Sequence, residues 1–473
     1  MSTTSDRPPT AVAEPRPKAA APTTPPGLAL RRLIRRVHFY AGVLTAPFLA
    51  ILCLTGIAYV FTPQIADVLY AKELLVEPQP GPARPLDEQV AAALATAPGA
   101  TLDSVLPAAE PDRTTHVVLT PPDVSTGSPE FGGNPENLTV YVDPYTAEVT
   151  GLLARTHGEP PVQNWLREFH GDLQLGTVGA VYSEFAASWL PVLFLGGRVV
   201  GVGKRRARGR ELGGPPASAR PGRRRMMNWH GGVGSWLTVA LVFISLTGLT
   251  WSTFAGERFQ TVLTSLDARS PQLTAEVAPP AAGATVIGAG VAESAGRAAG
   301  LQGPLTLEPP AQPGDPYVVK ETSDSAPIQR DKVALDPSTG TVVETIRFAD
   351  YPLLAKLTSI GIMAHTGTLF GLANQIAMTA MSLGILAVIF WGYRMWWLRR
   401  PTHTQPRPLE ARGVLASTPQ PILFGMVLTA VLLGWLLPVF GVSLVLFLLV
   451  DTAVGAQHRR RARRSGAPPV ASD

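Results

Sequence analysis

The sequence predicts a mainly α-helical integral membrane protein. Its four-helix transmembrane core is built from two repeated halves, followed by a C-terminal hydrophobic hairpin, with two small α+β domains outside the membrane. Three observations lead to this fold class: four long apolar stretches recur along the 473 residues, parts of the chain repeat at an offset near 192 residues, and charged residues make up 16% of the chain where about 25% is usual. A single cysteine, Cys53, excludes internal disulfides, cysteine-ligated iron–sulfur clusters and zinc ribbons. Any redox chemistry would therefore need a bound cofactor.

The apolar stretches are long enough to cross a bilayer of about 30 Å, which needs about 20 helical residues. They run over 37–61, 178–202, 229–254 and 376–398. A fifth apolar region, 422–450, has Pro438 and Gly441 at its middle. We interpret it as a hairpin of two short helices, with a single tilted span as the alternative.

Lysine and arginine residues predict the orientation of the chain in the membrane. Of the 40 basic residues, 24 lie in short segments that flank the apolar stretches, whereas the two long outside segments hold 13 basic and 27 acidic residues. The positive-inside rule therefore places both termini in the cytoplasm and the chain in the inner (cytoplasmic) membrane as a multi-pass protein. This topology accounts for the basic pI of about 9.4, so we expect no nucleic acid partner.

The boundaries that follow divide the chain into eleven parts. They are a disordered cytoplasmic tail (1–27), transmembrane helix 1 (28–61), an outside domain (62–163), transmembrane helix 2 (164–202), a basic cytoplasmic loop (203–225), transmembrane helix 3 (226–254), a second outside domain (255–355), transmembrane helix 4 (356–399), a cytoplasmic loop (400–420), the hairpin (421–452) and a basic cytoplasmic tail (453–473). Within the outside domains, alternation and alanine content predict helices and strands. The predicted helices are 86–97 and 286–300, and the predicted strands are 115–119, 138–142, 317–320, 332–335 and 341–346.

An internal repeat relates the two halves of the chain, each with the order helix, outside domain, helix. The offset is 192 residues in the first and third apolar stretches and 193 to 195 further on. The matched positions are Leu54-Thr55-Gly56 with Leu246-Thr247-Gly248, His38 with His230, Asp143-Pro144 with Asp336-Pro337, and His170 with His365.

Four of the eight histidines lie at the edges of the predicted spans, namely His38, His170, His230 and His365. A single histidine at a membrane edge is usually an ordinary headgroup-level residue, but four in register with a repeat are functional candidates. The topology places His38 and His230 at the cytoplasmic end, and His170 and His365 at the outer end. Each layer thus holds two imidazoles, with no carboxylate or thiol beside them to complete a tetrahedral zinc site.

Two imidazoles per layer suit haem, because the porphyrin supplies the four equatorial nitrogens and leaves two axial positions to the protein. The sequence therefore predicts two b-type haems, with His38 and His230 as axial ligands of one iron and His170 and His365 of the other.

Glu184 lies 14 residues after His170, which on one continuous helix places it deeper in the membrane on nearly the same face. It is a candidate proton relay or quinol contact, with a structural hydrogen bond as the plainer alternative. No other catalytic residue is assigned. The remaining histidines are expected to be solvated in loops or tails, and they are His116, His157, His403 and His458.

Several segments together resemble the PepSY-associated transmembrane helix family, which includes iron-regulated membrane proteins and inner-membrane ferric-siderophore reductases. The resemblance covers about residues 28–451. The segments that carry it are 35–42 (RRVHFYAG), 54–56 (LTG), 165–172 (WLREFHGD), 228–231 (NWHG) and 364–371 (AHTGTLFG). It implies PepSY-like outside domains, histidine-ligated haem, and reduction of iron delivered as a siderophore complex. Thr366 is neutral where many relatives have an acidic residue.

The leading hypothesis is therefore a membrane electron-transfer protein, a ferric-chelate oxidoreductase that passes electrons outward to a ferric siderophore or another ferric chelate. Its electron donor is a quinol or a soluble cytoplasmic reductant, since no flavin or nicotinamide motif is visible. Two alternatives remain open. One is a membrane-anchored regulatory or binding module without redox activity, and the other is an iron or haem permease, which duplicated helical halves would suit.

Overall fold

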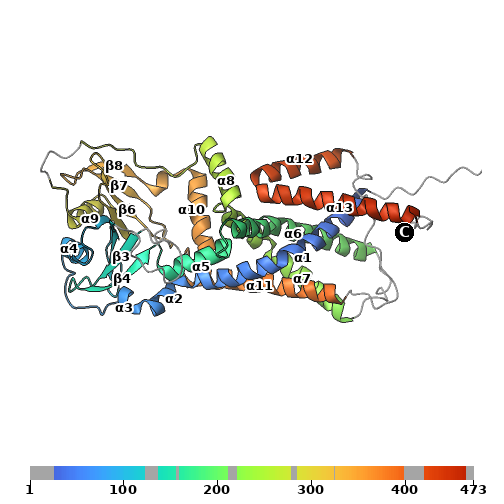
Figure 1. Cartoon of the computed structure of the whole chain (residues 1–473), viewed down its shortest axis with the longest axis horizontal. Coiled ribbons are helices and arrows are strands. Elements are labelled where there is room, and N and C mark those ends of the chain that lie inside the picture. Colours follow the sequence, from blue (N-terminus) through green and yellow to red (C-terminus); the bar gives the residue numbers. More distant parts are fainter. Residues whose placement is uncertain are drawn as a thin grey trace, which may run out of the picture.

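The computed structural model describes residues 26–122, 137–155, 159–210, 221–278, 285–323, 325–398 and 420–464. Most of the predicted N-terminal tail lies outside these residues, as do His157 and His403. The molecule is elongated, with the β-strands at one end of its long axis and the long helices at the other (Figure 1).

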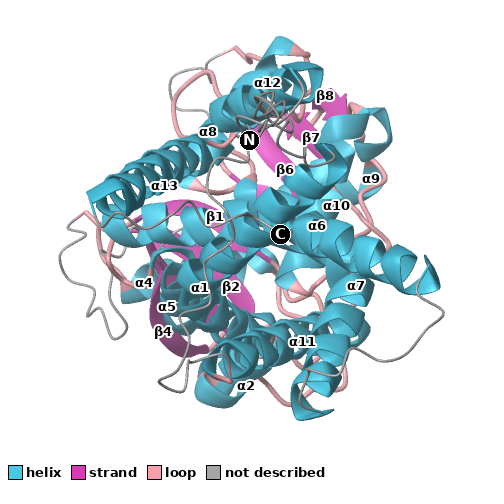
Figure 2. Cartoon of the chain, turned by 90° about the vertical axis from the view of Figure 1, so that its right-hand side faces the viewer, coloured by secondary structure: helices cyan, strands magenta, loops and turns pink. Residues whose placement is uncertain are grey.

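Among the residues that the structure describes, four helices are long and apolar enough to cross a membrane, which confirms the predicted four-helix core. They are α1 (Pro26–Val60), α6 (Thr177–Arg210), α7 (Pro221–Leu249) and α11 (Leu372–Trp397). Each of α6 and α11 packs against both α1 and α7, and buried residues of all four helices form one apolar core. Figure 2, which looks along the long axis, shows the four helices grouped together.

Two shorter helices, α5 (Pro161–Asp172) and α10 (Leu353–Thr366), come immediately before α6 and α11. The sequence predicts one continuous helix in each place, and this is wrong because left-handed residues interrupt the backbone. Leu173, Gln174 and Gly176 have φ angles of 59°, 59° and 56°, and Gly367 and Gly371 have φ angles of 86° and 56°. A residue in this conformation ends a helix, and glycine adopts it without the steric cost of a Cβ.

The C-terminal apolar region forms two helices in contact with each other, α12 (Gln420–Leu436) and α13 (Pro438–Arg464). The break comes at Pro438, where a proline at the first position of a helix is well tolerated. Helix α13 packs on α6, where the indole Nε1 of Trp189 donates a hydrogen bond to Ser443 Oγ at 2.9 Å. The predicted hairpin thus corresponds to two helices, with α12 further from the bundle (Figure 1).

The two outside segments join in a single eight-stranded antiparallel sheet, so the expectation of two separate small units is corrected. The strand order is β4-β3-β2-β1-β5-β6-β7-β8, and β1 pairs with β5 at Val105 and Leu307. Four strands alone would leave the edge of β1 or β5 unpaired, and pairing these edges satisfies their backbone groups. The strands are β1 (Thr101–Leu106), β2 (Thr115–Thr120), β3 (Asn137–Val142), β4 (Val149–Arg155), β5 (Leu305–Glu308), β6 (Tyr317–Glu321), β7 (Lys332–Leu335) and β8 (Val342–Ile346).

Five of these strands fall where the sequence predicts them, and β1, β4 and β5 were not predicted. The missed strands are short or carry an interior polar residue or glycine, so they lack the alternation by which strands are recognised. Helices α4 (Leu86–Thr96) and α9 (Ala289–Ala298) pack on one face of the sheet and close a single apolar core with both halves.

The opposite face of β3 and β4 connects the sheet to the membrane helices. Helices α2 (Thr62–Leu69), α3 (Ala71–Leu74) and α5 pack there around a cluster that includes Tyr70, Tyr141 and Leu166. In the second half, α8 (Thr253–Ser265) instead packs against α6, α12 and α13, and the short η2 helix (Phe348–Asp350) leads into α10. Helix α5 is therefore fixed between the sheet and α1.

Candidate functional site

The four membrane-edge histidines form two facing pairs. His38 on α1 and His230 on α7 have ring centroids 6.1 Å apart with planes at 85°, and we call them the far-side pair because they lie at the bundle end away from the sheet. His170 on α5 and His365 on α10 have centroids 6.4 Å apart with planes at 63°, and we call them the sheet-side pair. Each pair combines one histidine from each half of the chain.

The two pairs lie at opposite ends of the membrane helices. On α1, Thr55, which contacts the sheet-side pair, comes 17 residues after His38, and on α7, Thr247 comes 17 residues after His230. At 1.5 Å of rise per residue these spacings correspond to about 25 Å along each helix. The pairs are therefore separated by most of the thickness of a bilayer core.

The centroid separations fit a metal ion bound between two imidazoles. Imidazole nitrogens coordinate metals at about 2 Å, and the ring radius adds about 1 Å on each side, so two coaxial ligands have centroids about 6 Å apart. Among the described residues, no three His, Cys, Asp or Glu side chains come together as a metal site. Each pair thus offers two nitrogen ligands, the number that a tetrapyrrole leaves to the protein.

In every ring, Nδ1 makes a hydrogen bond to a neighbouring helix. In the far-side pair the acceptors are backbone carbonyls, and in the sheet-side pair the partners are threonine hydroxyls. The distances are His38 Nδ1 to Leu193 O, 2.8 Å; His230 Nδ1 to Val388 O, 3.0 Å; His170 Nδ1 to Thr55 Oγ1, 2.9 Å; and His365 Nδ1 to Thr247 Oγ1, 3.1 Å. A carbonyl can only accept a hydrogen bond, so it fixes the imidazole proton on Nδ1. The lone pair of Nε2 is then available to bind a metal ion.

Each ring also lies over a glycine of the helix that it contacts. A Cβ added to the glycine would approach the Cε1 atom of the ring, to 3.3 Å at Gly197 (His38), 3.7 Å at Gly392 (His230), 3.2 Å at Gly56 (His170) and 3.0 Å at Gly248 (His365). In the far-side pair, the carbonyl that accepts the Nδ1 hydrogen bond lies four residues before the glycine, at Leu193 before Gly197 and at Val388 before Gly392. The missing side chain lets the imidazole lie flat against the helix backbone.

Gly197 and Gly392 are not among the residues predicted from the sequence, although the repeat contains a signal for them. They are separated by 195 residues, the offset that also relates His170 to His365. Gly56 and Gly248 belong to the repeated Leu-Thr-Gly motif, whose function the sequence alone did not reveal.

The far-side pair lines a cavity of about 550 Å³, within the 300–1,000 Å³ range of ordinary cofactor and ligand pockets. Seven glycines contribute to its wall, so helix backbones form much of the surface, and two arginines reach it. These residues are Gly42, Gly197, Gly201, Gly231, Gly232, Gly234, Gly392, Arg35 and Arg198. The cavity, its two facing imidazoles and its two cations fit a flat, anionic tetrapyrrole.

Glu184 does not face either pair, so the prediction that it lies on a continuous helix with His170 is wrong. The helix break after α5 removes the register on which that prediction depended. The carboxylate is buried and accepts hydrogen bonds from the backbone N–H groups of Phe254 at 2.9 Å and Ala255 at 3.2 Å. Because Ser252 at the N-cap makes no side-chain cap, Glu184 caps α8 from a neighbouring helix.

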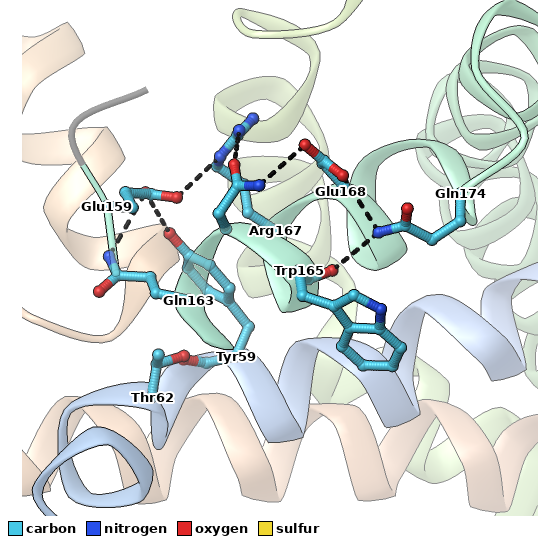
Figure 3. Close-up of polar contacts among 9 residues, drawn as sticks. Tyr59, Thr62, Glu159, Gln163, Trp165, Arg167, Glu168 and Gln174 are labelled. Atoms are coloured by element: carbon cyan, nitrogen blue, oxygen red, sulfur yellow. Dashed lines mark hydrogen bonds and ion pairs between the residues drawn. The ribbon is translucent and has the colours of Figure 1, made fainter. Parts of the chain in front are cut away.

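Polar side chains of α5, the helix that carries His170, form a hydrogen-bond network with Glu159 (Figure 3). Arg167 Nε donates to Glu159 Oε2 at 2.8 Å, and Asn164 donates to Glu168 at 3.0 Å. The Arg167 guanidinium also donates to Asn164 Oδ1 at 2.6 Å. These contacts brace α5 one to two turns before His170.

His116 is not solvated in a loop, which corrects the expectation from the sequence. It lies on β2, and its ring contacts Tyr141 on β3 with centroids 4.7 Å apart. Burial, and secondarily the charges of Arg155 and Arg113, lowers the pKa of His116 to about 4. Burial of this kind therefore marks a structural histidine of the sheet, unrelated to either pair.

Comparison with known proteins agrees with the resemblance seen in the sequence. The family model described as "PepSY-associated TM region" matches residues 35–399, which is 365 of the 473 residues. No curated protein matches the chain.

Proposed function

The chain belongs to the PepSY-associated TM family, and from this premise and the two facing histidine pairs we propose that it is a di-haem b electron-transfer protein of the cell membrane. Its role would be to carry electrons outward and reduce ferric iron, held as a siderophore complex or another ferric chelate. The observation that carries this proposal is the geometry of the pairs: two imidazoles face each other at about 6 Å at each end of the membrane helices.

The residues of this chain would hold each haem by the same means. His38 with His230, and His170 with His365, would be the axial ligands, and the Nδ1 hydrogen bonds would hold each ring in position with Nε2 toward the iron. Arg35 and Arg198 at the far-side cavity would pair with propionates. When bound, haem would supply the one-electron chemistry.

The orientation in the membrane completes the proposal. The basic segments that flank the four apolar helices support cytoplasmic termini, with the far-side pair at the cytoplasmic end and the sheet outside. The electron donor would be a quinol or a soluble cytoplasmic reductant. The two halves of the sheet would be PepSY-like domains of a repeated chain, placed next to the outer pair through α5.

The substrate follows from the coordination chemistry of iron. Ferric iron prefers the hard oxygen ligands of siderophores, and reduction to the ferrous state weakens that preference, so one electron loosens the metal from its chelator. The sheet end of the molecule, with α5 and α10 beside it, would be the side on which the ferric chelate accepts the electron.

The decisive experiment is an optical and redox analysis of the purified protein. We expect two low-spin b-type haems that dithionite reduces and that a ferric siderophore reoxidises, with iron-free siderophore as the control. A preparation that stays colourless after haem supplementation would contradict the proposal and leave a regulatory module or a permease. If the protein binds haem but ferric chelates do not reoxidise it, haem binding is supported and ferric chelates are excluded as its substrate.

A further inference from the structure

The two pairs differ in one position of an otherwise shared arrangement. In all four cases the ring lies over a glycine of a neighbouring helix, and its Nδ1 makes a hydrogen bond to that helix. On the sheet side, the residue just before the glycine is Thr55 or Thr247, whose hydroxyl lies against Nδ1. At the corresponding far-side positions, Gly196 and Trp391 have no hydroxyl to offer.

The hydroxyl protons of these threonines are already directed elsewhere. Thr55 Oγ1 donates toward Ile51 O at 2.9 Å and Leu52 O at 3.2 Å. Thr247 Oγ1 donates toward Ile244 O at 2.9 Å and Phe243 O at 3.1 Å. A hydroxyl has one proton and two lone pairs, so each oxygen is left to accept from the imidazole Nδ1–H.

A buried threonine does not need an imidazole to satisfy its hydroxyl. Thr45 on α1 and Thr238 on α7 are buried threonines of the same two helices. Each donates to the carbonyl four residues earlier, Ala41 O at 2.9 Å and Gly234 O at 2.7 Å. Thr55 and Thr247 make the same kind of backbone bond, so their contacts with the rings go beyond what the hydroxyls require.

We propose that Thr55 and Thr247 are positioning residues of the sheet-side pair, which orient His170 and His365 and strengthen them as axial ligands. This inference rests on the proposed haem binding. A hydrogen-bond acceptor on Nδ1–H makes the imidazole a stronger electron donor, which stabilises ferric over ferrous iron. The sheet-side ligands are therefore adjustable through two side chains, whereas the far-side ligands depend on backbone carbonyls that a substitution cannot remove.

The test uses matched threonine variants of the full-length, haem-loaded protein. Thr55→Val and Thr247→Val remove the acceptor at nearly constant volume, while Thr45→Val and Thr238→Val remove a hydroxyl from the same helices away from the sheet-side rings. Potentiometric titration, electron paramagnetic resonance of the ferric state and the rate of haem transfer to an apoprotein acceptor report on each haem. Single variants of His38 and His365 assign the signals to the two sites.

We expect Thr55→Val and Thr247→Val to raise the reduction potential of one haem, change its g values and weaken its retention by roughly tenfold. The other haem should be unchanged, and Thr55→Ser should restore the wild-type signals. The two control variants should match the wild type in all three measurements.

The outcomes separate this inference from the proposed function. If the wild type holds two haems and Thr55→Val is indistinguishable from Thr45→Val, the positioning role is wrong and haem binding stands. Equal shifts in both haems would also contradict it, because the contacts are confined to one pair. A wild type without haem overturns both. If Thr55→Val fails to fold, the more exposed Thr247→Val and the Ser variant decide the question.

Discussion

The far-side and sheet-side pairs show how one chain builds two similar sites from different local structures. His38 and His230 lie in the N-terminal half of long helices, whereas His170 and His365 lie in the last turn of short helices that end at left-handed residues. All four rings nevertheless lie over a glycine of a neighbouring helix and make an Nδ1 hydrogen bond to that helix. The two pairs thus share the glycine-containing helix face against which each ring packs, and they differ in the type of helix that carries the histidine.

The comparison is tested most strongly by removing one histidine from each pair. If the proposed haems are present, His38→Ala should abolish haem binding at the far-side pair and spare the sheet-side pair, and His365→Ala should do the reverse, because each site would lose one of the two imidazoles that would hold its haem. Haem content per protein and reduced-minus-oxidised spectra measure the result. Loss of both haems, or of neither, in each variant would show that the pairs are not separate sites.

Glycine substitutions should affect the two pairs differently, because the glycine–ring contacts are tighter on the sheet side. An added Cβ would come 3.0 Å from His365 at Gly248 but 3.7 Å from His230 at Gly392, which is an ordinary contact. We expect Gly248→Ala to lower occupancy or shift the spectrum of the sheet-side haem, while Gly392→Ala leaves both haems intact. Alanine favours a helix over glycine by about 1 kcal/mol, so a loss in Gly248→Ala would not arise from the helix itself.

Haem occupancy in the two glycine variants can also contradict this expectation. If Gly392→Ala and Gly248→Ala reduce haem binding equally, distance to the ring does not set the effect, and the glycines serve helix packing in both halves.

Glu184→Gln tests whether Glu184 has a structural role only, apart from both histidine pairs. The carboxylate caps α8, so its loss should lower the free energy of unfolding by about 1–3 kcal/mol through the two backbone N–H groups. Both haems should retain their spectra. Thermal denaturation in detergent measures the effect, with the exposed Glu257→Gln on α8 as the control. A changed potential at the far-side haem would instead restore the idea of a role near that pair.

His116 belongs to neither pair, and we expect its substitution to have the smallest effect, a change in the pH dependence of stability. Its pKa of about 4 in the folded protein is below the unfolded value of 6.5, so between these pH values the unfolded chain binds a proton that the folded chain does not. The free energy of unfolding should therefore fall as the pH falls from about 6.5 to 4, by up to about 1.4 kcal/mol per pH unit. His116→Phe should flatten this dependence and leave haem content unchanged. Equal pH dependence of the melting temperature in both proteins would show that His116 does not titrate in this way.

Much of the membrane part could be predicted from composition and spacing. Length and hydropathy alone identify the four spans, because a bilayer requires about 20 apolar residues in a row. The repeat offset relates His38 to His230 and His170 to His365 before any coordinates are known. The sheet was harder, because β1, β4 and β5 are recognisable as strands only once their partners are in place.

Residue type and position along the chain are enough to predict the membrane character, the four histidines and their division between two ends. The hydrogen-bond partners of the rings, the cap that Glu184 makes on α8 and the sheet shared by the outside segments became visible with the folded chain. The reason is physical: hydrophobic length is a local property, but hydrogen-bond partners, helix breaks at left-handed residues and strand edges depend on atoms brought together from distant parts of the chain.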